Sequence, residues 1–134
     1  WEAEWEFACR GGTMERFCFG NDPVLIHKYG WIGDGQRLGA RRVGQGASNS
    51  FGLFDMHGNV WEFCQDFHGP YPSMAVTDPT GPAVGDLRVG RGGTWGTYAE
   101  LSRSAYRSSG NGGAYSTGFR VARDLNVPDD GTAN

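Results

Sequence analysis

The chain has 134 residues, a formal net charge of −3 and a sequence pI of about 5.5, which fits one domain and leaves no room for two. Its 23 glycines follow no three-residue period, and no apolar run reaches the roughly 18 residues of a membrane-spanning helix. Collagen-like and membrane-spanning classes are therefore excluded. Lys and Arg are scattered along the chain and form no long basic stripe, so nucleic acid is not expected as a partner.

The three cysteines indicate neither a zinc site nor a redox pair. Cys9, Cys18 and Cys64 show no CxxC spacing, and their odd number allows at most one disulfide within the chain. The sequence starts at Trp1 without the charged and apolar segments of a signal peptide, which leaves the compartment open. Display on the cell surface or outside the cell is compatible with it, and the oligomeric state also stays open.

The first ten residues give the clearest helix pattern. Trp1, Trp5 and Ala8 share one helical face, acidic residues come early, a basic residue comes last, and Gly11-Gly12 ends the helix. Residues 20–46 are punctuated by Gly, Asp, Asn and Pro, which predicts an ordered loop with short extended pieces.

The middle of the chain predicts a turn, a strand and a loop. Residues 51–67 alternate loosely around a tight turn at Gly58-Asn59 and are expected to lead into a strand. Residues 69–86 are rich in Pro and Gly and predict a surface loop.

Two later segments, 87–95 and 118–123, alternate apolar and polar residues and predict strands, the second with Phe119 and Val121 facing inward. Between them, residues 96–117 are small and polar and include three tyrosines. This composition is typical of a binding loop.

Five motifs in this chain occur in a recognisable order. They are EAEWEFACRGG (2–12), NSFGLFDMHGNVWEF (49–63), RVGRGGTW (88–95), RSAYR (103–107) and GFRVAR (118–123). Together they resemble the formylglycine-generating enzyme (sulfatase-modifying factor) family. The resemblance implies an α+β, C-type-lectin-like fold that is loop-rich, with a small twisted antiparallel sheet and few helices. It also implies a single domain over residues 1–124 without the family's N-terminal part, followed by a flexible tail at 125–134.

The resemblance also identifies where the family's catalytic cysteines would lie. In members that oxidise a substrate cysteine to formylglycine, two cysteines after the RGGSW-like strand bind copper(I). Aligned on residues 92–95, these positions are Thr97 and Ser102 in this chain. A hydroxyl group is hard and stays protonated at neutral pH, so neither copper nor this enzymatic activity is expected.

A structural calcium ion is the cofactor that the resemblance implies. Carried over from related enzymes, the ligands are the side chains of Asp55 and Glu62 and the carbonyl groups of Gly58 and Val60. Carboxylates and carbonyls are the ligands that calcium requires. The alternative is that Glu62 only bonds backbone groups of the turn.

The family also includes non-catalytic members, the variable proteins of diversity-generating retroelements, in which adenine-derived codons are mutated. Residues 96–116 are rich in the Tyr, Ser, Gly, Thr, Ala and Asn that such mutation yields, and Tyr with small polar residues makes an adaptable binding surface. The predicted ligand-binding residues are Gly96, Thr97, Tyr98, Ser102, Tyr106, Ser108, Ser109, Asn111, Tyr115 and Ser116. The expected ligand is a protein or a glycan.

Two alternatives to a variable binding protein stay open, namely a fixed scaffold or binding domain of the same family and a sulfatase-modifying oxidoreductase. Whichever holds, Arg103, Arg107 and Arg120 are expected to hydrogen-bond carbonyl groups beneath the loop, because a guanidinium group has five donors in a planar arrangement.

Overall fold

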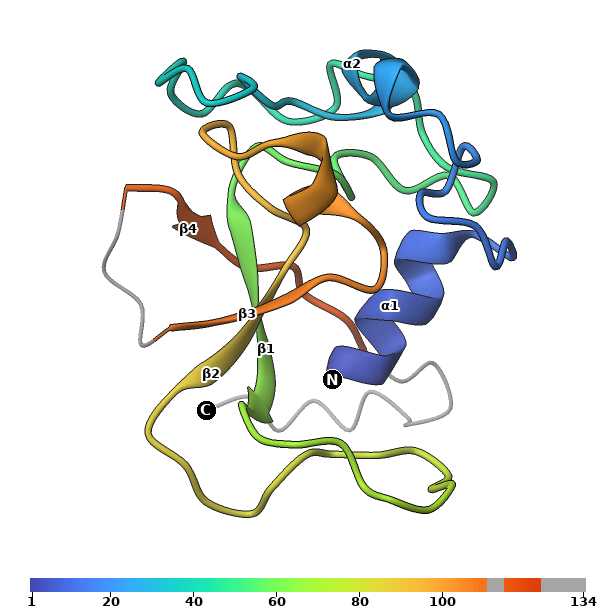
Figure 1. The fold of residues 1–134 in the computed structure, drawn as a ribbon, viewed down its shortest axis with the longest axis vertical. Helices are drawn as coiled ribbons and strands as arrows, with labels where there is room; N and C mark the ends of the chain where they lie inside the picture. The colour runs from blue at the N-terminus through green and yellow to red at the C-terminus, as the bar shows by residue number, and fades with distance from the viewer. Residues whose placement is uncertain (111–114, 124–134) are drawn as a thin grey trace, which may run out of the picture.

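The computed structural model describes residues 1–110 and 115–123. Its helices and strands, in chain order, are α1 (Glu2–Arg10), α2 (Ile26–Tyr29), β1 (Trp61–Phe67), β2 (Arg88–Arg91), β3 (Arg107–Gly110) and β4 (Thr117–Gly118) (Figure 1). Two short 3-10 turns lie at Pro23–Leu25 and Ala99–Ser102. Long loops connect these elements, so the predicted loop-rich α+β fold with few helices is confirmed. The predicted tail at 125–134 lies outside the described residues.

The predicted N-terminal helix is present as α1. It ends at Gly11, whose left-handed conformation (φ 59°) lets its N–H bond the carbonyl of Phe7 at 3.4 Å. Trp5 and Cys9 on its inner face are buried, and the helix packs against β1 and β2. The spacing therefore predicted the helix correctly. Of the face predicted from Trp1, Trp5 and Ala8, only Trp5 is buried, because Trp1 is 42% exposed and Ala8 is half-buried.

The four strands form one sheet in the order β3-β2-β1-β4. β1 pairs antiparallel with β2, placing Glu62 opposite Arg91, and β2 pairs antiparallel with β3. β4 runs parallel to β1, with Trp61 opposite Thr117. The expectation of a purely antiparallel sheet was therefore wrong for this last pair, because the chain reaches the far edge of the sheet by a connection instead of a hairpin.

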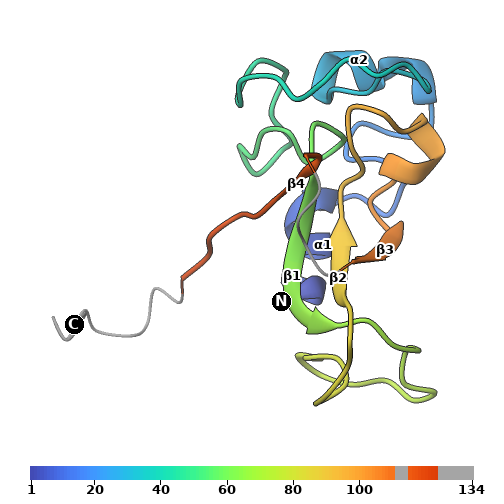
Figure 2. The same cartoon turned by 90° about the vertical axis from the view of Figure 1, so that its left-hand side faces the viewer.

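The predicted strands at 87–95 and 118–123 are shorter than expected. β2 ends at Arg91 because Gly92 and Gly93 have positive φ angles of 90° and 83°. β4 stops at Gly118, and Phe119 and Val121 are 78% and 82% exposed, so the prediction that they face inward was wrong. Beyond β4 the chain runs away from the sheet (Figure 2).

Two elements were not foreseen. β3 lies inside the segment that was expected to be a loop, because its sequence Arg-Ser-Ser-Gly has no apolar alternation and its pairing with β2 is set by the fold. The short helix α2 lies inside the loop predicted over 20–46, where one turn of helix is too short to show a period. The strand predicted at the end of 51–67 is present as β1.

Two apolar clusters form the core. The first contains Trp5, Cys9, Met56, Cys64 and Val89, and the second contains Phe17, Ile26, Ile32 and Ala99. The buried His57 ring contacts Phe17 and Phe19 edge-on, with ring centroids 5.6 and 5.4 Å away. Within the described residues, none of the helices has the length and apolar character needed to cross a membrane.

Candidate ligand-binding surface

A sharp turn after β2 brings Thr97 and Ser102 together, the two residues that the motif alignment predicts at catalytic cysteine positions. A Cβ atom on Gly93 would lie 2.2 Å from the Ser102 hydroxyl oxygen, so the backbone approaches Ser102 as only glycine allows. The Thr97 Oγ1 atom lies 3.3 Å from the Ser102 Oγ atom. The same Thr97 hydroxyl donates to the Thr94 carbonyl at 2.8 Å and accepts the Thr94 N–H at 3.1 Å.

The predicted ligand-binding residues fall into exposed and buried groups. Tyr98, Ser109 and Tyr115 are exposed, and no heavy atom lies within 4 Å of the point where Gly96 would carry a Cβ atom. Thr97, Tyr106, Ser108 and Ser116 are half-buried. Ser102 is completely buried, so it does not contribute to a surface, and Asn111 lies outside the described residues.

The exposed Tyr98 and the half-buried Tyr106 contact different parts of the protein. The Tyr98 hydroxyl lies against the backbone of Gly35, where a Cβ atom would be 2.5 Å away. Tyr106 packs on Trp61 with ring centroids 6.1 Å apart, and the Ser116 carbonyl accepts the Trp61 N–H at 2.8 Å. Tyr106 and Ser116 therefore both contact Trp61 in β1, whereas Tyr98 contacts Gly35.

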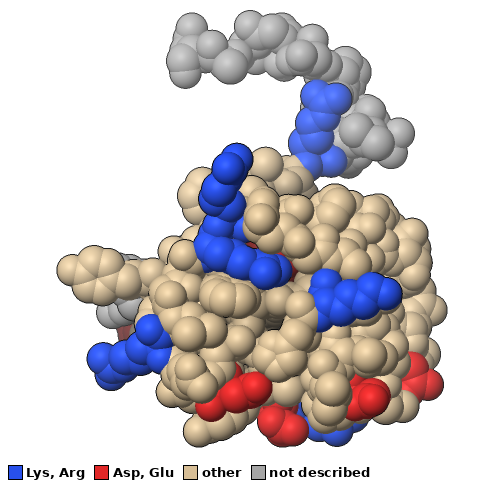
Figure 3. Space-filling model, turned by 90° about the horizontal axis from the view of Figure 1, so that it is seen from above, with Lys and Arg blue, Asp and Glu red and all other residues tan. Residues whose placement is uncertain are grey.

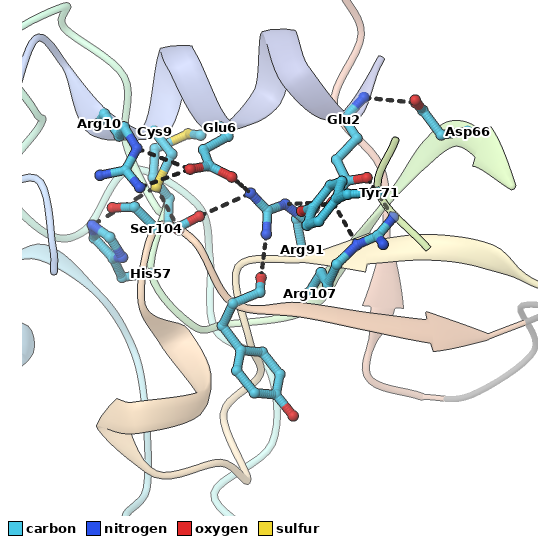
Figure 4. A network of polar contacts seen from close by, with 12 residues as sticks. Glu2, Glu6, Cys9, Arg10, His57, Asp66, Tyr71, Arg91, Ser104 and Arg107 are labelled. Atoms are coloured by element: carbon cyan, nitrogen blue, oxygen red, sulfur yellow. Dashed lines mark hydrogen bonds and ion pairs between the residues drawn. The ribbon is translucent and has the colours of Figure 1, made fainter. Parts of the chain in front are cut away.

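The buried side chain of Arg91 hydrogen-bonds the backbone of residues 96–116 (Figure 4). The Arg91 guanidinium is fully buried and donates to the carbonyl groups of Tyr106 at 2.5 Å and Ser104 at 3.0 Å. It also forms an ion pair with Glu6 of α1, and its Nε atom lies 3.7 Å from the Glu2 carboxylate. The role of Arg91 was not predicted, although an arginine inside an alternating strand was the available signal.

A second ion pair ties α1 to the start of β3. Arg107 donates to both carboxylate oxygens of Glu2, at 2.9 and 2.7 Å, and to the Gly69 carbonyl at 2.6 Å. The Glu2 backbone N–H in turn donates to the buried Asp66 carboxylate at 2.6 Å. The start of the helix is thereby joined to β1, β3 and the loop after β1 (Figure 4).

The other two predicted arginines also bond carbonyl groups. Arg103 donates to the Glu100 carbonyl at 2.8 Å, and Arg120 donates to the Phe54 carbonyl at 2.9 Å. The prediction that these arginines hydrogen-bond carbonyl groups is correct. The carbonyl groups that Arg107 and Arg120 bond, however, belong to other loops and not to residues 96–116.

His57 links the same segment to the core. Its Nε2 atom accepts the Cys18 N–H at 3.2 Å, so its Nδ1 atom carries the hydrogen and donates to the Ser102 carbonyl at 2.8 Å. Burial lowers the pKa of His57 to about 4, although the bond to Ser102 raises it in part. His57 is therefore neutral at physiological pH.

The three cysteine side chains are free thiols. Burial raises the pKa of Cys9 and of Cys64 to about 12, and that of Cys18 to about 11. All three are therefore protonated at neutral pH, and a protonated thiol is neither a good nucleophile nor a good metal ligand.

The four predicted calcium ligands line one cleft of about 400 Å³. Asp55 uses one carboxylate oxygen to accept the Gly44 N–H at 2.5 Å. Its other oxygen, Oδ1, is buried without a hydrogen-bond partner and lies 3.9 Å from the Arg41 guanidinium. Both Glu62 oxygens are occupied by Arg120, at 2.8 and 3.0 Å, and one also accepts the Trp5 ring N–H. The alternative that Glu62 only bonds turn backbone is therefore wrong.

A metal ion at this cleft would depend on carbonyl groups as well as carboxylates. In the part of the chain that the structure describes, no three His, Cys, Asp or Glu side chains lie close enough together to hold one. Asp55 fits a cation because its buried Oδ1 atom accepts no hydrogen bond and has only the distant Arg41 guanidinium beside it, at 3.9 Å, whereas Glu62 would have to give up Arg120.

Comparison with known proteins decides the family. The profile of the sulfatase-modifying factor enzyme 1-like domain matches residues 1–125. The chain belongs to this family.

Formylglycine-generating enzyme from Streptomyces coelicolor is 35% identical over 146 residues, which cover 94% of this chain and 46% of that protein. Serine/threonine-protein kinase pkn1 from Chlamydia pneumoniae is 36% identical over 132 residues, 93% of this chain and 20% of that protein. The chain thus spans less than half the length of these relatives.

Two solved structures of similar fold confirm the assignment to the sulfatase-modifying factor family. Treponema denticola variable protein 1 superimposes with a TM-score of 0.81 and 32% identity, over 88% of this chain and 44% of that one. PvdO from Pseudomonas aeruginosa gives a TM-score of 0.70 and 28% identity, over 88% and 49%. The fold class and family predicted from the five motifs are therefore correct.

Proposed function

We propose that this chain is a non-catalytic ligand-binding domain of the sulfatase-modifying factor family, with a variable surface between residues 96 and 116 as in the variable proteins of diversity-generating retroelements. The observation that carries this proposal is the contact between Thr97 and Ser102, whose hydroxyl oxygens lie 3.3 Å apart. The motif alignment assigns the two catalytic cysteines to these positions, and their closeness supports that alignment.

The chemistry of this pair argues against copper catalysis. Copper(I) prefers soft thiolate ligands, and two hydroxyl groups held by backbone hydrogen bonds do not provide them. The cysteines that the chain does have are protonated, because burial raises the pKa of each. The pair is therefore better explained as a hydrogen-bonded support for the turn than as a reaction centre.

Residues 96–116 include exposed positions at which different side chains could be accommodated. Tyr98 and Tyr115 are exposed, and Gly96 has open space around it. Tyrosine offers a large amphipathic contact area with little loss of conformational entropy on binding. The likeness to Treponema denticola variable protein 1 supports the same proposal. The ligand would be a protein or a glycan.

Sequencing the coding segment for residues 87–123 across a population of the source organism tests this proposal. Substitutions confined to adenine-derived codons, at exposed positions such as 96, 98 and 115, are expected. Codons for Arg91, Gly93 and Arg107 should stay unchanged because these residues support the backbone. A segment that is invariant across the population would contradict a variable surface and leave a fixed binding or scaffold domain.

A second candidate function is the oxidation of a substrate cysteine to formylglycine. The 35% identity to the formylglycine-generating enzyme of Streptomyces coelicolor favours it. The test is to supply copper(I) to the protein and measure formylglycine in a cysteine-containing peptide by mass spectrometry. Product that disappears when Cys18 is replaced by Ser would support the enzyme, whereas no product would leave the binding function.

We also propose calcium as a structural ligand of the cleft at Asp55. Its buried Oδ1 atom accepts no hydrogen bond and lies 3.9 Å from Arg41, and Gly58 and Val60 line the same cleft. Calcium should raise the melting temperature and a chelator should lower it. Asp55→Asn should remove this sensitivity, as should Glu62→Gln if the glutamate exchanges Arg120 for the ion. A melting temperature unaffected by calcium or chelator would contradict calcium binding, and Asp55 and Glu62 would then have only the structural roles described above.

A further inference from the structure

A basic loop borders the proposed ligand-binding surface. It consists of residues 28–42, which contain Lys28, Arg37, Arg41 and Arg42. We infer that this basic loop binds carboxylate groups on an acidic protein ligand, beside Tyr98. The inference rests on the proposed function, because it assigns the chemistry of the partner that the variable surface would bind.

The basic side chains of the basic loop form few hydrogen bonds or ion pairs with other described residues of the protein. Arg37 and Arg42 are exposed, and within the described residues neither makes a side-chain hydrogen bond or an ion pair. Lys28 is also exposed, and its ammonium group lies 5.4 Å from the centre of the Tyr29 ring. Because the whole chain has a net charge of −3, this positive charge is a local concentration.

Two acidic side chains contact the basic loop or its neighbours. Asp34 belongs to the loop itself and lies 3.4 Å from His27, and Asp55 lies 3.9 Å from Arg41. Glu100 lies 4.0 Å from Arg16. Among the described residues, Lys28, Arg37 and Arg42 therefore carry the positive charge that is free to meet a ligand. Figure 3 looks down on the end of the molecule that carries α2 and this loop, and shows Lys and Arg standing across the face with Asp and Glu along one border. An acidic ligand would therefore meet separate Lys and Arg side chains on this face, away from the border that carries Asp and Glu.

Arg41 fixes the loop. Its backbone N–H donates to the Asn59 side chain at 2.9 Å, and its guanidinium lies 4.9 Å from the Trp31 ring centre and bonds the Gly30 carbonyl at 3.3 Å. The Trp31 ring N–H also donates to the Gly39 carbonyl at 2.9 Å. Arg37 and Arg42 are therefore presented from an ordered backbone, which lowers the entropy lost on binding.

The basic loop is continuous with the proposed ligand-binding surface. Gly35 lies against the Tyr98 hydroxyl, and a Cβ atom on Gly33 would be 2.8 Å from the Trp95 carbonyl oxygen. Leu38 and Tyr98 are 47% and 56% exposed. This combination of arginines with apolar side chains fits an acidic protein surface better than a nucleic acid or sulfated glycan, whose charged groups would leave the apolar area unused.

Guanidinium groups suit this task because their planar donors bind a carboxylate in pairs. The arginines of the basic loop lie outside residues 96–116, so they would be present in every variant of a diversified surface. They would favour acidic partners in general, while the variable side chains would choose among them.

The test measures binding of a fluorescent synthetic peptide of alternating Glu and Tyr, by polarisation, at about 0.05 and 0.5 M salt. The double variant Arg37→Gln/Arg42→Gln should weaken binding roughly tenfold at low salt, and high salt should remove the difference. The control is Arg88→Gln/Arg123→Gln, which makes the same charge change outside the basic loop and should leave binding unchanged. Tyr98→Ala should also weaken binding, by a few-fold.

Four results would overturn the inference. They are failure of the peptide to bind, equal loss in the control variant, tighter binding of heparin or single-stranded DNA than of the peptide, and no effect of Tyr98→Ala. The proposed function fails separately, through an invariant coding segment, so the two failures are distinguishable. Thermal melting of each variant verifies that it is folded, as expected for substitutions at exposed side chains.

Discussion

The buried arginines and the exposed tyrosines of this protein lie along the same stretch of chain but differ in what they contact. Arg91 is fully buried, bonds two backbone carbonyl groups and pairs with glutamates of α1. Tyr98 and Tyr115 project from the same stretch with more than half of their surface exposed. The backbone of residues 96–116 is thus held from below by side chains that do not belong to its exposed surface.

This difference indicates how such a fold could vary its surface without unfolding. A buried charge that loses its partner is costly, because it cannot recover its hydration. An exposed tyrosine loses only part of its own contacts when replaced. Stability should therefore depend strongly on Arg91 and Gly93 and weakly on the exposed positions, and the following experiments test that gradient.

The largest effect is expected from Arg91→Met. The variant leaves two carbonyl groups without their donor and removes one of the two arginines that pair with each of Glu2 and Glu6, while Arg107 and Arg10 remain. We expect it to cost about 3–5 kcal/mol of unfolding free energy. Urea unfolding followed by circular dichroism measures it. Arg88→Met on the same strand is the control and should cost about 1 kcal/mol or less. Similar losses in both variants would contradict a special role for Arg91.

Gly93→Ala should have the next largest effect. Its φ angle of 83° is strained for alanine, and the new Cβ atom would lie 2.2 Å from the Ser102 hydroxyl, so a loss of roughly 2–4 kcal/mol is expected. Gly96→Ala is the matched control, since open space surrounds that position, and should change stability by less than about 0.5 kcal/mol. Equal tolerance at both glycines would disprove this description of the turn.

Acid should weaken the link between His57 and the segment. His57 has a pKa of about 4 in the folded protein against 6.5 when unfolded, so its contribution is complete above pH 6.5 and is lost as the pH falls toward 4. At pH 5 the loss is about 2 kcal/mol. His57→Gln should show a correspondingly smaller fall in unfolding free energy between pH 7 and pH 5. An unchanged pH dependence in this variant would show that other groups cause it.

The smallest effects are expected at the exposed tyrosines. Tyr98→Ala and Tyr115→Ala should each change the unfolding free energy by no more than about 0.5 kcal/mol, because these side chains are largely in solvent. Tyr106→Ala is the comparison, since this ring packs on Trp61 and should cost more. If Tyr98→Ala were more destabilising than Tyr106→Ala, Tyr98 would contribute to the stability of the fold and would not be a purely exposed side chain.

Local sequence patterns predicted the elements whose own residues carry the signal. The helix α1 has apolar spacing and an ending at Gly11, and β1 follows a turn marked by Gly58-Asn59. β3 could not be predicted, since its four residues become a strand only through pairing with β2. The segment after Gly118 shows the converse, because its alternation of apolar residues is present but no neighbouring strand covers it among the described residues.

The candidate site divides in the same way. Its composition between residues 96 and 116 is visible in the sequence, and the motifs are enough to predict that Thr97 and Ser102 occupy the catalytic cysteine positions. That Ser102 is buried and that Glu62 is occupied by Arg120 are not visible, because both depend on contacts between distant parts of the chain.

The sequence by itself therefore determined the family, the principal helix and the chemical character of the exposed segment, since motifs, periodicity and composition are properties of neighbouring residues. Only the tertiary structure decided which polar groups are buried and what neutralises them. Arg91 pairs with Glu6, which lies 85 positions away along the chain. Such a partnership leaves no local pattern, because the cost of burying a charge is offset only where the fold brings its partners together.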